Sequence, residues 1–275
     1  MLPILFKLGP FSIYSYGFFL TLAYLAGTFF FWREGKKRGF SEEKLLDLSV
    51  LALLAALVGG RILYVLINWN LFSLDPKSSL FLWQGGFAYF GSLFAAVVVV
   101  WYFVRAWKWP FFQIADLGAI AAALSFTIGK FGTFLAGTDY GSQTNLPWGV
   151  VFPNLVGSRH PVQLYEAFVS LLILFFLIRL YFKNIEKSGS MRSGVVFFDY
   201  LILSGVARLV LEFFRADSDF VAGVALAQIL SLIVATVGAV CLYYFGLRNL
   251  RTDLRVVLKR LSNLDFKLRG VLTRR

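Results

Sequence analysis

The chain contains one cysteine and one histidine in 275 residues, which limits the chemistry that its side chains can supply. Cys241 alone can form neither an internal disulfide nor a cysteine metal cluster, and its apolar surroundings are typical of a small packed residue. With His160 as the single histidine, no cluster of metal ligands stands out, and no motif indicates an organic cofactor. We therefore expect neither a metal nor a cofactor.

Charged residues are also scarce, at 15% of the chain against about 25% in soluble proteins. Hydrophobic residues make up 59%. This composition excludes an ordinary soluble domain and predicts a polytopic membrane protein.

Seven apolar runs are long enough to cross about 30 Å of hydrocarbon, which takes roughly 20 helical residues. They cover residues 13–32, 45–67, 87–104, 113–136, 163–182, 195–214 and 221–246. The runs lack the two-residue alternation of barrel strands, and lipid admits only helices or closed barrels. We predict an all-α fold, a seven-helix bundle that forms a single transmembrane domain over residues 1–246, followed by a basic cytoplasmic tail over 247–275.

Lysine and arginine are distributed unequally between the two sides of this predicted bundle. The first, third and fifth connections and the C-terminal tail are rich in them, whereas the opposite side holds only Lys7, Lys77, Arg159 and Arg215. Positive residues favour the cytoplasmic side, so the N-terminus is predicted to lie outside and the C-terminus in the cytoplasm of a bacterial cell. We expect the basic tail to lie on anionic lipid and not to bind nucleic acid.

Charged side chains within the apolar runs fall at one depth. At 1.5 Å per residue, Arg61, Lys130 and Arg208 lie about 20 to 26 Å from the inner ends of their runs, in the outer half. Glu212 follows one helical turn after Arg208, and Glu166 stands at the outer end of the fifth run. Charges inside a membrane are costly and commonly functional, and an excess of cations suits an anionic ligand such as a phosphate.

Ordinary structural roles remain open for the same residues. Arg208 and Glu212 are four residues apart and can form a structural ion pair. Arg61 and Lys130 can extend to the outer headgroups. His160 precedes a proline at a helix start and can cap that helix. The shared depth favours one common site over these separate roles.

Six sequence blocks, taken in order, indicate a family. They are LGPFSIYSYG (8–17), GGRILYVLIN (59–68), WQGGFAYFGS (83–92), GKFGTFLAGTDYG (129–141), RHPVQLYE (159–166) and ARLVLEFFR (207–215). Over nearly its whole length the chain resembles the prolipoprotein diacylglyceryl transferases. These enzymes of the bacterial inner membrane move a diacylglyceryl group from phosphatidylglycerol to the lipobox cysteine of a prolipoprotein.

The resemblance implies partners and roles for the polar residues. The partners are phosphatidylglycerol, prolipoprotein signal peptides and membrane lipids. Arg208, His160 and Glu166 are the candidate catalytic residues; the candidate substrate-binding residues are Lys130, Arg61, Gln163, Tyr165, Glu212, Asp139 and Tyr16. Arg208 and Lys130 would hold the lipid phosphate, with Arg61 near it or supporting the bundle. The carboxylates would orient the cations, and His160, Gln163 and Tyr165 would shape the headgroup pocket or assist proton transfer.

Several positions depart from the pattern of this family. Phe90 stands where histidine is frequent, Lys130 where arginine is usual, Thr138 where glutamate is usual and Ser204 where tyrosine is typical. Lysine lacks the two-pronged guanidinium, and phenylalanine cannot transfer a proton, so an active chain would need His160 or Glu166 as its base. A non-catalytic lipid-binding or assembly protein on the same scaffold is therefore the main alternative. A small-solute transporter is less favoured because no inverted repeat is present.

Overall fold

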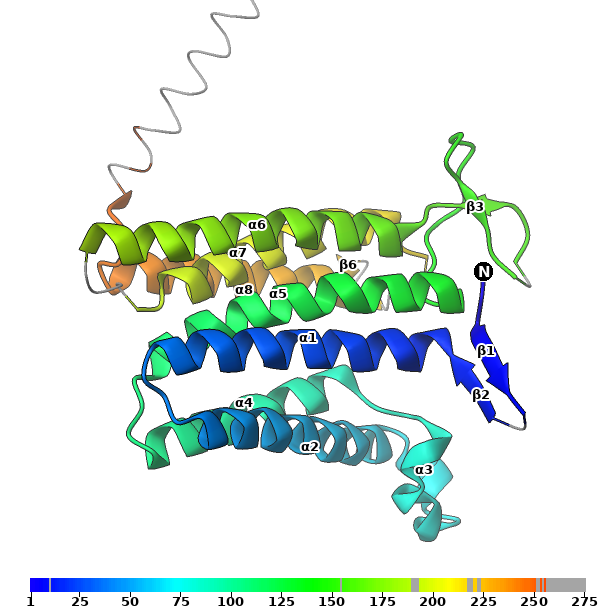
Figure 1. Cartoon of the computed structure of the whole chain (residues 1–275). Coiled ribbons are helices and arrows are strands. Elements are labelled where there is room, and N and C mark those ends of the chain that lie inside the picture. Colours follow the sequence, from blue (N-terminus) through cyan, green and yellow to red (C-terminus); the bar gives the residue numbers. More distant parts are fainter. Residues whose placement is uncertain are drawn as a thin grey trace, which may run out of the picture.

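The computed structural model describes residues 1–9, 11–153, 155–188, 193–216, 220–221, 224–250, 253 and 255. Long helices run side by side over most of its length (Figure 1). These are α1 (Ser15–Lys37), α2 (Glu42–Ile67), α4 (Tyr89–Ala106), α5 (Phe111–Ala136), α6 (Val162–Ser188), α7 (Val195–Leu211) and α8 (Leu226–Tyr244). Short turns α3 (Trp69–Phe72), η1 (Pro76–Leu80) and η2 (Leu82–Gln84) connect α2 to α4, and η3 (Glu212–Phe214) continues α7.

Six of the long helices, α1, α2, α4, α5, α6 and α8, are long and apolar enough to cross a membrane. The chain is therefore a helical, multi-pass membrane protein. Helix α7 has 17 residues and lies against α6 and α8. The seventh crossing and the orientation of the bundle stay predictions. Most of the predicted basic tail, 247–275, lies outside the described residues.

The helices are arranged in pairs. Helix α1 packs along α5, α2 along α4, and α7 along α8, and α1 with α5 separates the α2–α4 pair from α6, α7 and α8 (Figure 1). Glycine allows α2 and α4 to approach each other closely. A Cβ atom added to Gly59 would lie only 2.6 Å from the Gly91 carbonyl oxygen. Small residues commonly allow such close approach in membranes. The α2–α4 pair thus forms a unit of its own beside the rest.

Short antiparallel strands, which the all-α prediction omitted, lie where chain segments turn outside the helices. They pair as β1 (Ile4–Leu8) with β2 (Phe11–Tyr14), β3 (Val150–Val151) with β4 (Ser158–Arg159), and β5 (Phe220–Val221) with β6 (Val224–Ala225). The N-terminal hairpin and the β3–β4 hairpin lie at the same end of the bundle (Figure 1). That end carries the polar site.

The best-packed apolar cluster lies toward the opposite end. It joins the last turns of α1, α4 and α6 to the first turns of α2, α5 and α7. Its most buried members include Leu45, Leu117, Ile120, Leu177 and Val196, each fully shielded from solvent. Burial of such side chains stabilises the bundle there. The bundle therefore has an apolar end that holds the helices together and a polar end that carries charged groups.

Candidate functional site

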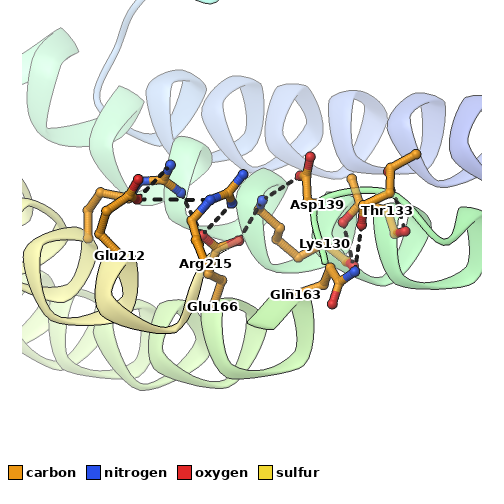
Figure 2. Close-up of polar contacts among 9 residues, drawn as sticks. Lys130, Thr133, Asp139, Gln163, Glu166, Glu212 and Arg215 are labelled. Atoms are coloured by element: carbon orange, nitrogen blue, oxygen red, sulfur yellow. Dashed lines mark hydrogen bonds and ion pairs between the residues drawn. The ribbon is translucent and has the colours of Figure 1, made fainter. Parts of the chain in front are cut away.

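Glu166 on α6 is the centre of an ion-pair network (Figure 2). Its side chain is 2% exposed; Oε2 lies 2.5 Å from Lys130 Nζ, and Oε1 lies 2.6 Å from Arg208 Nη1. Arg215 Nη1 lies 3.4 Å from the same Oε1 atom. One buried carboxylate thus connects α5, α6, α7 and the residue that follows η3.

Two further carboxylates complete the network. Glu212 Oε2 lies 3.1 Å from Arg208 Nη2 and 3.9 Å from Arg215 Nε. Asp139 Oδ2 lies 3.0 Å from Lys130 Nζ on the other side (Figure 2). The six side chains therefore carry three positive and three negative formal charges. Buried charges are tolerated when they are paired in this way.

Local backbone geometry brings these side chains together. Helix α5 ends at Gly137 in the left-handed region, and Asp139 also adopts a positive φ of 59°, which turns its carboxylate back toward Lys130. Helix α6 begins directly after Pro161, so Glu166 lies in its first turns. Beyond α7, the Ser142 N–H donates to the Phe214 carbonyl oxygen at 2.8 Å and ties the loop after α5 to η3.

The members of the network differ in exposure. The side chains of Glu166 and Glu212 are 2% exposed, whereas those of Arg208 and Asp139 are each 34% exposed. A ligand that approaches from outside the bundle therefore meets Arg208 before the buried carboxylates. Guanidinium groups bind phosphate with two parallel hydrogen bonds. The arrangement can hold an anion at Arg208 while Glu166 and Glu212 fix the position of the guanidinium.

Gln163 lies one turn before Glu166 and is fully buried. Its Nε2 atom donates a 2.5 Å hydrogen bond to the carbonyl oxygen of Thr138. Among the described residues, its Oε1 atom has no hydrogen-bond partner. Gln163 therefore links α6 to the end of α5 and keeps one buried acceptor beside the network.

His160 lies beside this network, in contact with Tyr165 on α6. The Tyr165 hydroxyl lies 3.3 Å from His160 Nδ1 and accepts a 2.8 Å hydrogen bond from Trp148 Nε1. The rings of His160 and Phe214 meet edge to face, with centroids 5.2 Å apart. The imidazole thus contacts the side-chain hydroxyl of Tyr165 in the first turn of α6 and not a backbone N–H of that turn, which is not the geometry of a helix cap.

Arg61 on α2 has different partners. Its guanidinium donates to backbone carbonyl oxygens of the loop that connects α2 to α4: Ser78, Ser79, Phe81, Gly85 and Gly86. A guanidinium has five N–H donors, so this set uses all of them. Within the described chain, Arg61 takes no part in the network around Glu166. Of the two roles expected for it, this geometry favours support of the bundle.

Tyr16 is also separate from the network. It lies at the start of α1 with 49% of its surface exposed. An open groove runs along the same part of α1; its lining comprises Ile13, Tyr14, Gly17, Phe18, Thr21, Leu22 and Leu25. The charged side chains around Glu166 line no part of this groove.

The positions that depart from the family pattern lie at varied distances from the site. Lys130 is part of the network, and Thr138 joins it through its carbonyl oxygen. The Ser204 hydroxyl donates to the Tyr200 carbonyl oxygen at 2.6 Å, within its own helix. Phe90 is 49% exposed at the start of α4. Of these substitutions, the one at Lys130 therefore affects the geometry of the charged network most directly.

Sequence reasoning missed Arg215, Trp148 and Phe214 as site residues. Arg215 follows Arg208 by seven residues and Glu212 by three, a spacing that marks one helical face. This spacing is visible in the sequence, although Arg215 was considered there only among the basic residues of the outer side. Trp148 and Phe214 had no such signal, because their approach to His160 depends on how the loop between α5 and α6 folds.

Comparison with known proteins identifies the family of the chain. The family model described as prolipoprotein diacylglyceryl transferase matches residues 3–244. Proteins named phosphatidylglycerol–prolipoprotein diacylglyceryl transferase from Trichormus variabilis and Clostridium tetani are each 31% identical to the chain, over 255 and 244 residues. The first alignment covers 90% of both chains; the second covers 86% of this chain and 95% of the relative. The chain belongs to the prolipoprotein diacylglyceryl transferase family.

Proposed function

We propose that the chain transfers the diacylglyceryl group of phosphatidylglycerol to the cysteine thiol of a prolipoprotein signal peptide in the bacterial inner membrane. The observation that carries this proposal is the network of Lys130, Arg208 and Arg215 around Glu166. It offers cations for the lipid phosphate at one end of a membrane bundle. Relatives that align with about 90% of the chain bear the name of this transferase.

The reaction requires a site that stabilises charge on the leaving group and a group that takes the thiol proton. The sulfur of the acceptor cysteine forms a bond to the terminal glyceryl carbon, and the bond from that carbon to the phosphate oxygen breaks. The leaving glycerol phosphate gains charge, which Arg208 and Lys130 would stabilise. The thiol proton passes to a base, for which His160 and Glu166 are the candidates, or to the released phosphate. No cysteine of this chain is needed, because the substrate supplies the nucleophile.

The predicted topology places this chemistry on the outer side. The network lies at the end of the bundle that is predicted to face the periplasm, where a signal peptide emerges from the membrane. At the other end, the last turns of α1 carry Arg33, Lys36 and Lys37, and Arg38 follows them, as the positive-inside rule requires of a cytoplasmic side. Acyl chains would leave sideways into the bilayer.

The test is expression of the chain in cells depleted of their own transferase, with lipidation of a lipobox substrate measured by mass spectrometry. We expect modified substrate with the natural chain and at least about 100-fold less with Arg208→Ala, because one donor on a developing charge is worth this much. Arg105→Ala is the matched control, since Arg105 is exposed at the opposite end of α4. A correctly inserted chain that leaves the substrate unmodified contradicts the proposal.

Lipid binding without transfer is the second candidate, and one observation favours it. Glu166, one of the two candidate bases, is within 3.4 Å of three cations, so its oxygens are occupied. Native mass spectrometry separates the two candidates. A binding protein would retain phosphatidylglycerol over phosphatidylcholine, lose it on Arg208→Ala and lipidate no substrate.

A further inference from the structure

A chain of hydrogen bonds connects an outer loop to the single histidine. Trp148, in the connection between α5 and α6, places its Nε1 atom 2.8 Å from the Tyr165 hydroxyl. The same hydroxyl lies 3.3 Å from His160 Nδ1. Tyr165 lies in the first turn of α6 and His160 precedes that helix, whereas Trp148 is 57% exposed on the loop. The loop therefore contacts the imidazole through one intermediate.

The donor inventory sets the direction of this chain. An indole N–H can only donate, so the Tyr165 oxygen must accept from Trp148. The hydroxyl hydrogen of Tyr165 is then free to donate to His160 Nδ1. A neutral imidazole that accepts at Nδ1 carries its proton at Nε2. The Trp148 contact thus favours the histidine tautomer that is protonated at Nε2.

The position of the ring is fixed independently of these hydrogen bonds. The His160 N–H donates to the Ser142 carbonyl oxygen at 3.0 Å, and its own carbonyl accepts from Gly141 at 3.1 Å. Phe214 packs edge to face against the ring. The backbone and Phe214 therefore hold the imidazole in place, so the Trp148–Tyr165 pair can act on the choice of protonated nitrogen without moving the ring.

We propose that Trp148 is a positioning residue that, through Tyr165, holds His160 as the Nε2–H tautomer and makes it a hydrogen-bond donor to an oxygen of the lipid headgroup. Within the described chain, the hydrogen bond of the His160 ring is made at Nδ1, which leaves Nε2 for a ligand. A donor at this atom suits a phosphate or glyceryl oxygen. In this tautomer Nε2 is not a proton acceptor, so His160 assists the leaving group and does not deprotonate the thiol.

Nuclear magnetic resonance of the ring nitrogens tests the tautomer directly. Because the chain has one histidine, protein labelled with ¹⁵N-histidine and purified with a histidine-free tag gives signals of His160 alone. At a pH where the ring is neutral, we expect an unprotonated Nδ1 and a protonated Nε2. Trp148→Phe keeps the ring but removes the N–H, and we expect the Nδ1–H form to become substantially populated.

One further variant repeats this test independently, and another serves as its control. Tyr165→Phe removes the intermediate hydroxyl and should give the same mixture of tautomers, even if Trp148→Phe fails to fold. Trp83→Phe changes an 80% exposed tryptophan on η2 and should leave the His160 signals as they are. A natural chain with the proton at Nδ1, or unchanged signals in both Trp148→Phe and Tyr165→Phe, overturns the proposal.

The donor role to the headgroup rests on the proposed function, and transfer activity tests it separately. We expect Trp148→Phe to lower kcat/KM by about threefold to tenfold, the worth of one hydrogen bond. In a His160→Ala background, Trp148→Phe should have no further effect, because it acts through the imidazole. Additive losses overturn the positioning role. If the chain transfers no lipid, the nitrogen signals still decide the tautomer, so failure of the proposed function is distinguishable.

Discussion

Arg61 and Arg208 lie toward the same end of the bundle, yet their partners differ in kind. Arg61 is 6% exposed and donates to backbone carbonyl oxygens of a single loop. Arg208 has a side chain that is 34% exposed and pairs with the carboxylates of Glu166 and Glu212. Neutral carbonyls surround the first guanidinium, and negative side chains surround the second.

The partners of each arginine determine whether it can bind a ligand. The carbonyls around Arg61 belong to the loop from η1 to the start of α4, so its hydrogen bonds fold that loop and leave no donor for a ligand. The partners of Arg208 are carboxylates, and a phosphate can take the place of a carboxylate at a guanidinium. Arg61 thus supports the fold, and Arg208 is suited to bind an anion.

The largest effect on stability is expected from Arg61→Met. The substitution keeps an apolar stem but removes the donor of several buried carbonyl groups, each of which costs about 1 kcal/mol or more when left unpaired. We expect the free energy of unfolding to fall by about 5 kcal/mol. Thermal unfolding in detergent measures the loss, with Arg105→Met as the control. If Arg61→Met and Arg105→Met had equal melting temperatures, Arg61 would not support the fold, and its distinction from Arg208 would be lost.

Glu166→Gln should have the next largest effect. The shape of the side chain is kept, but Lys130, Arg208 and Arg215 lose a shared negative charge. We expect the free energy of unfolding to fall by about 3 kcal/mol, because removal of one partner leaves buried charges unpaired. Phosphatidylglycerol should restore more of the melting temperature than phosphatidylcholine does, since its headgroup carries a net negative charge whereas that of phosphatidylcholine is zwitterionic. Equal recovery with both lipids would argue against an anion site.

Hydropathy alone predicted much of the fold, because membrane helices must satisfy their backbone groups internally. The long helices follow from apolar runs such as 113–136, where α5 spans Phe111–Ala136. The short strands were not predicted, since two-residue pairs such as Val150–Val151 with Ser158–Arg159 are fixed by the loop around them and not by a periodic pattern. The count of crossings depends on α7, which has 17 residues.

The candidate site was predictable only in part. Depth alone grouped Arg61 with Lys130 and Arg208, but depth does not report position around the bundle axis. The structure places Lys130 and Arg208 on either side of Glu166 and puts Arg61 on the separate α2–α4 pair. The identity of hydrogen-bond partners is a property of the folded loop, which the order of residues in the sequence does not reveal.

Lys130→Arg should change activity moderately. The arginine supplies a two-pronged donor in place of a point charge, and the resemblance to the family implies an arginine at this position. Because Lys130 Nζ is already shared between Glu166 and Asp139, added donors can reach the lipid phosphate without breaking these pairs. We expect kcat/KM to rise about fivefold, measured by lipidation in detergent. Lys44→Arg, at the opposite end of the bundle, should have no effect, and a fall in activity at position 130 would show that lysine suits this chain better.

The smallest effect is expected from Asp139→Asn. Asparagine also tolerates the left-handed backbone found there, so the turn after α5 should persist. The lost pair with Lys130 involves a carboxylate whose side chain is 34% exposed, and such pairs contribute less than about 1 kcal/mol. The network would however gain one net positive charge, so we expect affinity for phosphatidylglycerol to rise about twofold while stability barely changes. Asp75→Asn, in the loop that Arg61 holds, is the matched control and should leave lipid affinity unchanged. Equal gains from both variants would mean that overall charge, and not the Glu166 network, attracts the lipid.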